Sequence, residues 1–181
     1  MKKIFTLLII LILFLGCSTN NDDSNSTTNT VVDIDGNSYQ IINICNQKWT
    51  KKNLNVSHYK NGDITTTLPN QANNQIQGAW CYINDPANET TYGKLYNWYA
   101  VNDPRGLAMT GWHIPTDSEW TTLTDCLGGM SVAGGKMKEE STLHWWDSNT
   151  NATNSSGFTG LPGGGRRPDG ESIYIGGFGI W

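Results

Sequence analysis

The stretch GWHIPTDSEWTTLTDCLGG, residues 111–129, predicts a helix with defined ends in a chain otherwise rich in Asn, Thr and Gly. Thr116 has the residue type of an N-cap, and Glu119 three residues later completes the pattern of a capping box. Gly128 is typical of the left-handed residue that ends a helix. Between these ends, three apolar side chains at helical spacing predict one buried stripe: Trp120, Leu123 and Leu127.

The length and charge of the chain exclude several classes of function. The 181 residues suit one domain once an N-terminal segment is removed. Without the two lysines of that segment, 10 basic residues remain against 16 acidic ones, a net charge of −6. The mature chain has no basic run longer than Lys51-Lys52 or Arg166-Arg167. We therefore expect no nucleic-acid partner, and membrane contact through lipid rather than through a polybasic patch.

The N-terminus predicts export and lipid attachment. Residues 1–16 combine two lysines with an apolar run over 4–15, which as a helix of about 18 Å is too short to span a bilayer. Cys17 follows in a context that resembles a bacterial lipoprotein cleavage box, with Phe14 where Leu is usual. The stretch NNDD at 20–23, with its two acidic residues, resembles a surface-export signal of some Bacteroidota lipoproteins. We expect a lipid-anchored protein of the outer membrane, exposed at the cell surface; the alternative is an ordinary secretory signal.

The rest of the chain divides into a tether and one domain. Residues 17–30, the lipidated Cys and a polar segment, are expected to be flexible, and the folded domain is expected over 31–181. Apolar runs on both sides of Asp35-Gly36 predict a hairpin with a two-residue turn, and residues 79–83 predict a short strand. A second helix is expected over 90–101, with its apolar stripe formed by Tyr92, Leu95, Tyr96 and Tyr99. The prediction is a loop-rich α+β domain with two short helices.

Several stretches resemble a known family. They are DIDGNSYQ (33–40), QKWTKKNLNV (47–56), TTYGKLYNWYAVNDPRGLAMTGWHIPTDSEWTTL (90–123), AGGKMKE (133–139) and ATNSSGFTGLPGGGRRPDGESI (152–173). Together they resemble the Fibrobacter succinogenes major paralogous domain over nearly everything from residue 31 on. The IPTDSEW piece is also similar to the formylglycine-generating, sulfatase-modifying group, which has a variant of the C-type lectin fold. The resemblance implies a C-type-lectin-like α+β fold with two short helices and small irregular antiparallel sheets.

The cysteines depart in part from the family pattern. After Cys17, the three that remain are widely spaced and predict neither metal-binding pairs nor a complete disulfide framework. Each is compatible with a buried thiol. Cys81 fits the family, but the family usually has Gly where Cys45 stands and an aromatic residue at Cys126. Because Cys45 and Cys126 both depart from the family pattern, a bridge between them is conceivable. Such a bridge requires α-carbons within about 7 Å.

The end of the chain is a further departure. The family continues beyond the point reached by residues 176–181 with strands that close its sheet. We therefore expect a domain truncated at its C-terminus, with an exposed apolar terminal strand. We also expect an unpaired sheet edge near the N-terminal strand, which would favour association.

No catalytic set is expected. The working cysteines of formylglycine-generating enzymes lie late in their domain, and no cysteine here matches them. His58, His113 and His144 are far apart and lack the spacing of metal ligands. Residues 147–154 form the stretch nearest to a calcium loop, and a solvated loop is the simpler alternative. We expect no catalytic residues, no metal-ligating residues and no cofactor, with calcium as the exception to test.

Two late stretches hold the candidate ligand-binding residues: Trp145, Trp146, Asp147 and Asn149 in the first, Arg166 and Arg167 in the second. Stacking rings beside planar hydrogen-bonding groups suit sugar recognition. The simpler alternatives are a core Trp covered by its neighbour, and an arginine pair in a surface turn. The sequence favours a non-catalytic binding or adhesion module for a glycan or an envelope protein. The alternative is a structural or assembly component of the envelope with no small ligand, and an enzyme is least favoured.

Overall fold

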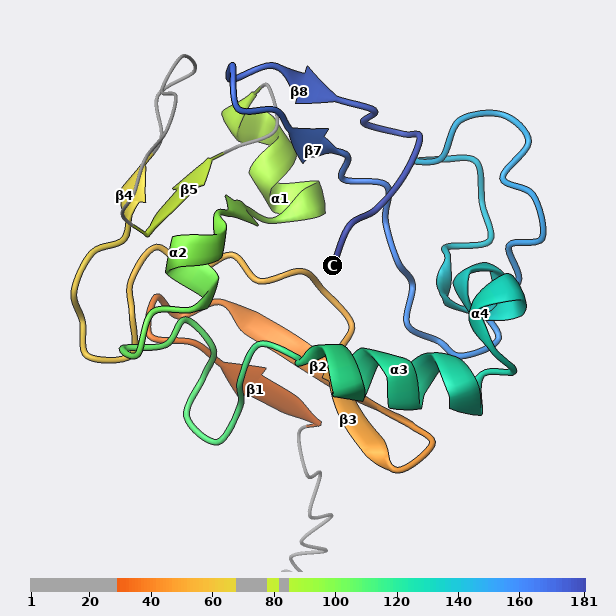
Figure 1. Ribbon diagram of the computed structural model, residues 1–181, viewed down its shortest axis with the longest axis horizontal. Coiled ribbons are helices and arrows are strands. Elements are labelled where there is room, and N and C mark those ends of the chain that lie inside the picture. Colours follow the sequence, from red (N-terminus) through yellow and green to blue (C-terminus); the bar gives the residue numbers. More distant parts are fainter. Residues whose placement is uncertain (1–28, 68–77, 82–84) are drawn as a thin grey trace, which may run out of the picture.

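The computed structural model describes residues 29–67, 78–81 and 85–181. The predicted signal peptide, the lipid attachment at Cys17 and nearly all of the tether lie outside these residues. The described chain is a loop-rich α+β domain with short elements (Figure 1). Its strands are β1 (Thr30–Val32), β2 (Ser38–Ile44), β3 (Gln47–Thr50), β4 (Thr66–Thr67), β5 (Ala79–Cys81), β6 (Leu95–Tyr96), β7 (Gly165–Arg166) and β8 (Ser172–Ile173). Its helices are the 3-10 turn η1 (Pro86–Asn88), α1 (Glu89–Tyr92), α2 (Trp98–Val101), α3 (Asp117–Cys126) and α4 (Met130–Met137).

The strands form three small sheets. Antiparallel β1-β2-β3 is the largest, β5 pairs parallel with β4 and antiparallel with β6, and β7 pairs antiparallel with β8. Strand β1 begins at Thr30, one residue before the expected start of the domain. No helix in this part of the chain has the length and hydropathy needed to cross a membrane.

The predicted hairpin at Asp35-Gly36 is confirmed, but its connection is longer than two residues. Val32 pairs with Ser38, so five residues join β1 to β2. The buried carboxylate of Asp33 organises this loop by accepting hydrogen bonds from the backbone N–H groups of residues 35 and 37 and from the Tyr39 hydroxyl. Burial and the hydrogen bond to Asp33 raise the pKa of Tyr39, so the phenol remains a donor.

Helix α3 has the ends that the sequence predicts. The Thr116 hydroxyl accepts from the Glu119 N–H at 3.3 Å, and the Glu119 carboxylate accepts from the Thr116 N–H at 2.8 Å, which completes the capping box. Gly128, just beyond the helix, has a φ of +102°. The predicted stripe also faces inward, with Trp120 half-buried at the edge of a core that contains Ile44, Trp49, Leu123, Leu127, Ala133, Met137 and Phe158.

The prediction of a single helix over 90–101 is wrong. The segment forms α1, then β6, then α2. Gly93 ends α1 with a φ of +72°, and a Cβ there would lie 2.7 Å from the Leu54 carbonyl oxygen. Asn97 then begins α2 by accepting a hydrogen bond from the Ala100 N–H. The apolar residues of this segment have helical spacing in sequence, but they lie on two short helices and on the strand between them. In that strand, the Tyr96 hydroxyl donates to the Val56 carbonyl at 2.7 Å.

Helix α4 was not expected, so the prediction of two helices is also wrong. Its sequence, MSVAGGKM, contains two glycines, which disfavour a helix. Tertiary contacts compensate, because Ala133 and Met137 enter the α3 core and Lys136 donates to the Leu127 carbonyl at 2.7 Å. Position 135 has room only for glycine, since a Cβ there would lie 2.4 Å from the Asn151 carbonyl oxygen.

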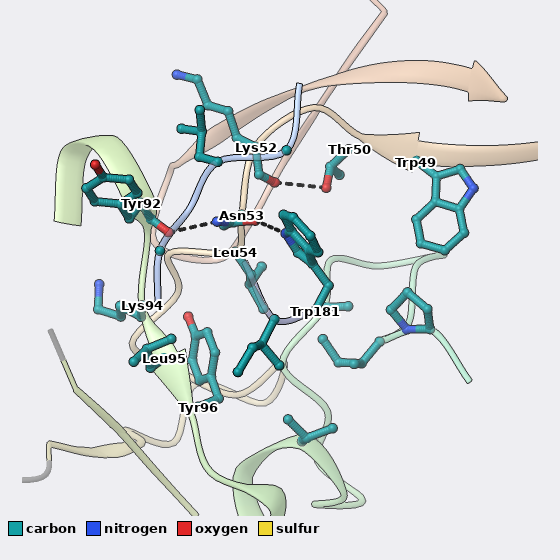
Figure 2. A pocket seen from close by; sticks show the side chains of 18 of the residues that line it. Trp49, Thr50, Lys52, Asn53, Leu54, Tyr92, Lys94, Leu95, Tyr96 and Trp181 are labelled. Carbon is teal, nitrogen blue, oxygen red and sulfur yellow. Dashed lines mark hydrogen bonds between the residues drawn. The ribbon is translucent and has the colours of Figure 1, made fainter. Parts of the chain in front are cut away.

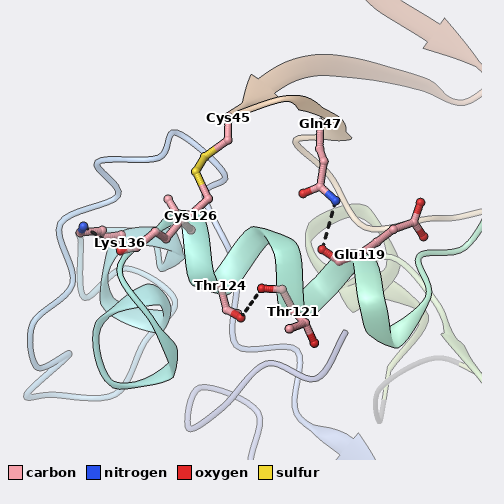
Figure 3. The surroundings of a disulfide bond; sticks show 8 residues. Cys45, Gln47, Glu119, Thr121, Thr124, Cys126 and Lys136 are labelled. Atoms are coloured by element: carbon pink, nitrogen blue, oxygen red, sulfur yellow. Dashed lines mark hydrogen bonds between the residues drawn. A yellow bond between two sulfur atoms is a disulfide. The ribbon is translucent and has the colours of Figure 1, made fainter.

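A disulfide joins Cys45 to Cys126, with α-carbons 6.6 Å apart (Figure 3). It connects the turn between β2 and β3 to the last residue of α3. At the other end of the helix, the Gln47 amide donates to the Glu119 carbonyl at 3.1 Å. The hairpin is therefore held against α3 at two points. Cys81 is a buried free thiol.

The expected exposed terminal strand is not present in the described residues, because 176–181 form turns and loop rather than a strand. Trp181 folds back instead, and its indole N–H donates to the Asn53 side chain at 2.9 Å. Its ring lies edge-on to Phe158 at 5.7 Å between centroids. The apolar end of the chain is thus partly covered by the core of its own domain.

The disulfide closes a loop of 81 residues, so the chain-entropy model assigns it about 4.5 kcal/mol of stabilisation at 25 °C. We expect the Cys45→Ser/Cys126→Ser variant to lose about that much free energy of unfolding in urea denaturation. Reductant should lower the stability of the wild type to the level of this variant and leave the variant unchanged. Equal stability of the oxidised wild type and the variant would contradict the prediction.

Glu119 predicts a pH dependence of stability. Hydrogen bonds from the Thr116 N–H and hydroxyl, and then His113, lower the pKa of Glu119 from 4.5 to about 2. A carboxylate with a lowered folded-state pKa stabilises fully above its unfolded pKa, and this contribution disappears as pH falls through the folded pKa. The stability advantage of the wild type over Glu119→Gln should therefore shrink between pH 4.5 and about 2. Urea denaturation across that range measures it, and a constant difference would argue against the capping carboxylate.

Candidate functional site

A cleft of about 1400 Å³ is lined by residues that belong to, or pack against, the two hydrophobic cores of the domain. The first core is built on α3, and the second contains Val56, Tyr59, Ala100 and Leu107. The lining comes mainly from five stretches that are distant in sequence: β3 with the loop after it, the α1–α2 region, the first turns of α3 with the loop before them, the segment 158–168, and the last two residues. Ile41 of β2 and Cys81 of β5 complete it. Short elements linked by long loops bring these stretches together around the C-terminal residues (Figure 1).

Aromatic rings form one wall of the cleft. Trp49 packs on Trp120 with ring centroids 4.6 Å apart, and Phe158 lies edge-on to both at 6.1 and 6.3 Å. The ring of Trp181 extends this cluster. Trp98, at the start of α2, also lines the cleft and is 67% exposed. The cleft therefore offers both a packed aromatic base and an indole with a free surface.

Asn53 connects three of the lining stretches (Figure 2). Its amide nitrogen donates to the Tyr92 carbonyl at 2.9 Å, and its oxygen accepts from the Trp181 indole at 2.9 Å. The planar amide is held by both of these bonds, so its orientation is set before any ligand arrives. An amide has two N–H donors and two acceptor lone pairs, so each of its polar atoms retains capacity for one more hydrogen bond to a ligand hydroxyl.

Lys94 is a buried cation at the side of the cleft. Its ammonium donates to the Glu89 carboxylate at 2.5 Å and to the backbone and side-chain oxygens of Asn55 at 2.8 and 3.0 Å. It also lies over the Trp80 ring, 4.6 Å from the centroid. With the Lys94 side chain 3% exposed, these contacts satisfy a charge that water does not reach. Lys94 thus fixes the position of β6 relative to the loop after β3.

His113 and Glu119 form the one His–carboxylate pair among the described lining residues, with Nε2 and Oε1 2.7 Å apart. The carboxylate is already used by the capping box, which lowers the pKa of Glu119 to about 2. An acid with this pKa is a weak proton acceptor near neutral pH. The pair therefore serves the start of α3 rather than resembling a general base.

The structure separates the residues that the sequence grouped as candidates. Arg166 and Arg167 line the cleft, whereas Trp145, Trp146, Asp147 and Asn149 do not. Trp145 is buried and donates to the Gly160 carbonyl at 3.2 Å. Trp146 is 58% exposed and lies over the backbone of Gly176, where a Cβ would come within 2.4 Å of its indole nitrogen. The Asn149 amide donates to the carbonyls of residues 139 and 141.

The oxygen-rich loop over residues 147–154 is organised by its own polar groups. The Thr150 hydroxyl bonds within the loop, and Asn154 bonds to Thr159 through both its amide nitrogen and its amide oxygen. Across the described residues, no group of three or more His, Cys, Asp or Glu side chains is placed to hold a metal ion.

Sequence reasoning missed Asn53, Lys94 and Trp181 as site residues. Asn53 and Lys94 lie in stretches that carry the family resemblance, QKWTKKNLNV and TTYGKLYNWYAV, which was a signal available without a structure. The contact between Asn53 and Trp181 could not be predicted from the sequence, because 128 residues separate them.

A family model described as the Fibrobacter succinogenes major domain matches residues 42–181. The chain belongs to this family. No curated protein and no solved structure matches the chain. The Fibrobacter succinogenes major domain begins within β2 and includes every lining residue of the cleft except Ile41. The cleft is therefore formed almost entirely by residues of the matched region.

We expect Lys94→Met in this Fibrobacter succinogenes major domain to lower the free energy of unfolding by about 3 kcal/mol, because it leaves Glu89 and Asn55 without their buried cation. Lys52→Met is the matched control, since Lys52 is exposed at the same cleft, and it should change stability by less than about 0.5 kcal/mol. Urea denaturation compares the two. Similar losses in both variants would mean that the Lys94 contacts do not stabilise the fold.

Proposed function

We propose that this protein is a non-catalytic binding module of the bacterial cell envelope, anchored through lipid on Cys17, and that its cleft binds a glycan. The observation that carries the proposal is the combination of exposed indole and oriented amide in one cleft of about 1400 Å³. Small-ligand sites are typically concave and largely apolar, with a few placed polar groups. The cleft meets this description with Trp98, the Trp181 ring and the Asn53 amide.

The chemistry of a sugar matches this lining. A pyranose has apolar ring faces that stack on an indole, and a rim of hydroxyls that exchange hydrogen bonds with planar amides. Trp98 is the exposed stacking surface, and Asn53 is the amide within reach of the same cavity. The proposal therefore moves the expected glycan site from the Trp145-Trp146 stretch to the cleft and retains Arg166 and Arg167 as members of its lining.

We further propose that the fold is a C-type-lectin-like variant of the sulfatase-modifying type. The capped α3 helix, the small irregular sheets and the large share of loop support it. The Glu119 carboxylate is committed to the helix start, which favours binding over catalysis. A calcium ion is not part of the proposal. A structural role in the envelope, with no small ligand, is the competing function.

We expect Trp98→Ala to weaken binding of a soluble hexasaccharide by at least about tenfold, because truncation of an exposed aromatic anchor typically costs 2 kcal/mol or more. The assay is isothermal titration calorimetry of residues 18–181 against neutral and acidic hexasaccharides. Trp146→Ala is the matched control, with a Trp of similar exposure outside the cleft.

Three results would contradict the proposal. Loss of binding in Trp146→Ala but not in Trp98→Ala would return the site to the Trp145-Trp146 stretch. Absence of saccharide binding, together with capture of the protein by an envelope protein complex, would favour the structural role. Turnover of a substrate would overturn the non-catalytic assignment.

The thermal melting temperatures of both variants should be close to that of the wild type, since both side chains are largely exposed.

A further inference from the structure

The charges of this protein are segregated between the cleft and the rest of the molecule. Six of the ten Lys and Arg residues in the described chain line the cleft, but only two of its fourteen Asp and Glu residues do. The lining therefore carries a formal charge of +4, and the remaining described residues carry −8. The cations of the cleft are Lys48, Lys51, Lys52, Lys94, Arg166 and Arg167.

The acidic side chains of the lining do not cancel this charge where a ligand would meet it. Glu119 is paired with His113 and with the start of α3. Asp117 lies in the first turn of the same helix, next to the positive end of its dipole. The lining is thus cationic at the loop after β3 and at β7, and acidic only at the N-terminus of α3.

Three of the cations have no acidic partner within the described chain. Lys48, Lys51 and Lys52 take part in none of the ion pairs formed there. Lys94, in contrast, is committed to Glu89, and Arg167 pairs with Glu171 at 2.6 Å. Lys51 and Lys52 directly precede Asn53, whose amide meets the Trp181 indole in the same cavity. Unpaired charge is therefore concentrated beside the proposed sugar-binding groups.

We propose that the ligand of the cleft is an anionic saccharide, whose carboxylate or sulfate groups meet Lys51 and Lys52 while its rings stack on the exposed indole. This inference rests on the proposed function and specifies its ligand class. A neutral sugar would leave these cations without a partner, whereas an anionic one complements a positive lining. The net charge of −8 on the described residues outside the cleft repels a long polyanion such as a nucleic acid. A short saccharide chain can enter with its charges confined to the lining.

The test uses isothermal titration calorimetry to compare three hexasaccharides: a hexamer of galactose, a hexamer of galacturonate and a hexamer of sulfated galactose. At about 20 mM salt, we expect at least one acidic hexamer to bind about tenfold or more tightly than the neutral one. At about 1 M salt the Debye length falls to about 3 Å, and this preference should drop severalfold. The two acidic probes distinguish a carboxylate from a sulfate source of the charge.

Charge-matched variants locate the effect. Lys51→Gln/Lys52→Gln should weaken binding of the preferred acidic hexamer by about tenfold at low salt and leave the neutral hexamer within about twofold. Lys60→Gln/Lys138→Gln removes the same charge outside the cleft and should leave both affinities nearly unchanged. The control for folding is a thermal melt of each variant, which should show one cooperative transition.

The outcomes separate this inference from the proposed function. If the galactose hexamer binds as tightly as the acidic ones, the anionic ligand is overturned and the glycan-binding cleft stands. An equal loss in both double variants would overturn the role of Lys51 and Lys52, because the effect would be one of net charge. Tighter binding of a hexanucleotide than of any saccharide would also overturn the inference. If no hexamer binds, both the inference and the proposed function fail.

Discussion

The packing of Trp49 is the contact on which the domain depends. Its buried indole lies against Trp120 of α3 and Phe158 of the late loops, so one side chain joins three parts of the chain that are far apart in sequence. The disulfide and the Gln47 amide hold the hairpin that carries Trp49 against α3. Because the same ring forms part of the cleft wall, the stability of the core and the shape of the site have a common origin.

Side-chain hydrogen bonds replace much of the regular secondary structure that this fold lacks. Asp33 organises the first hairpin, Lys94 ties β6 to the loop after β3, and Asn53 joins three walls of the cleft. Short polar side chains compete well for nearby backbone groups, which explains how a chain rich in Asn and Thr can order long loops. Cys45 has a φ of +54°, a left-handed conformation that Gly would adopt without strain.

Local signals were read correctly where the interactions they describe are local. The capping box of α3 lies within four residues, and the paired part of the hairpin at Asp35-Gly36 lies within eleven, so local sequence patterns predicted both. The prediction of one helix over 90–101 was wrong because Gly93 passes close to the Leu54 carbonyl, a tertiary contact that residue spacing does not reveal. Helix α4 was missed for a similar reason, since its two glycines are tolerated only because Ala133 and Met137 are buried.

The amino-acid sequence by itself determined the family, the α+β class and the ends of the central helix, because these depend on short motifs and on local backbone preferences. It also contained the candidate arginines, Arg166 and Arg167, but did not show the cleft that they line. Only the tertiary structure decided that Cys45 pairs with Cys126, that Trp145 is buried, and that Asn53 and Trp181 meet in a cationic cleft. Those features arise from contacts across 81 and 128 residues, and the closure of such loops is set by the packing of the whole chain rather than by any segment of it.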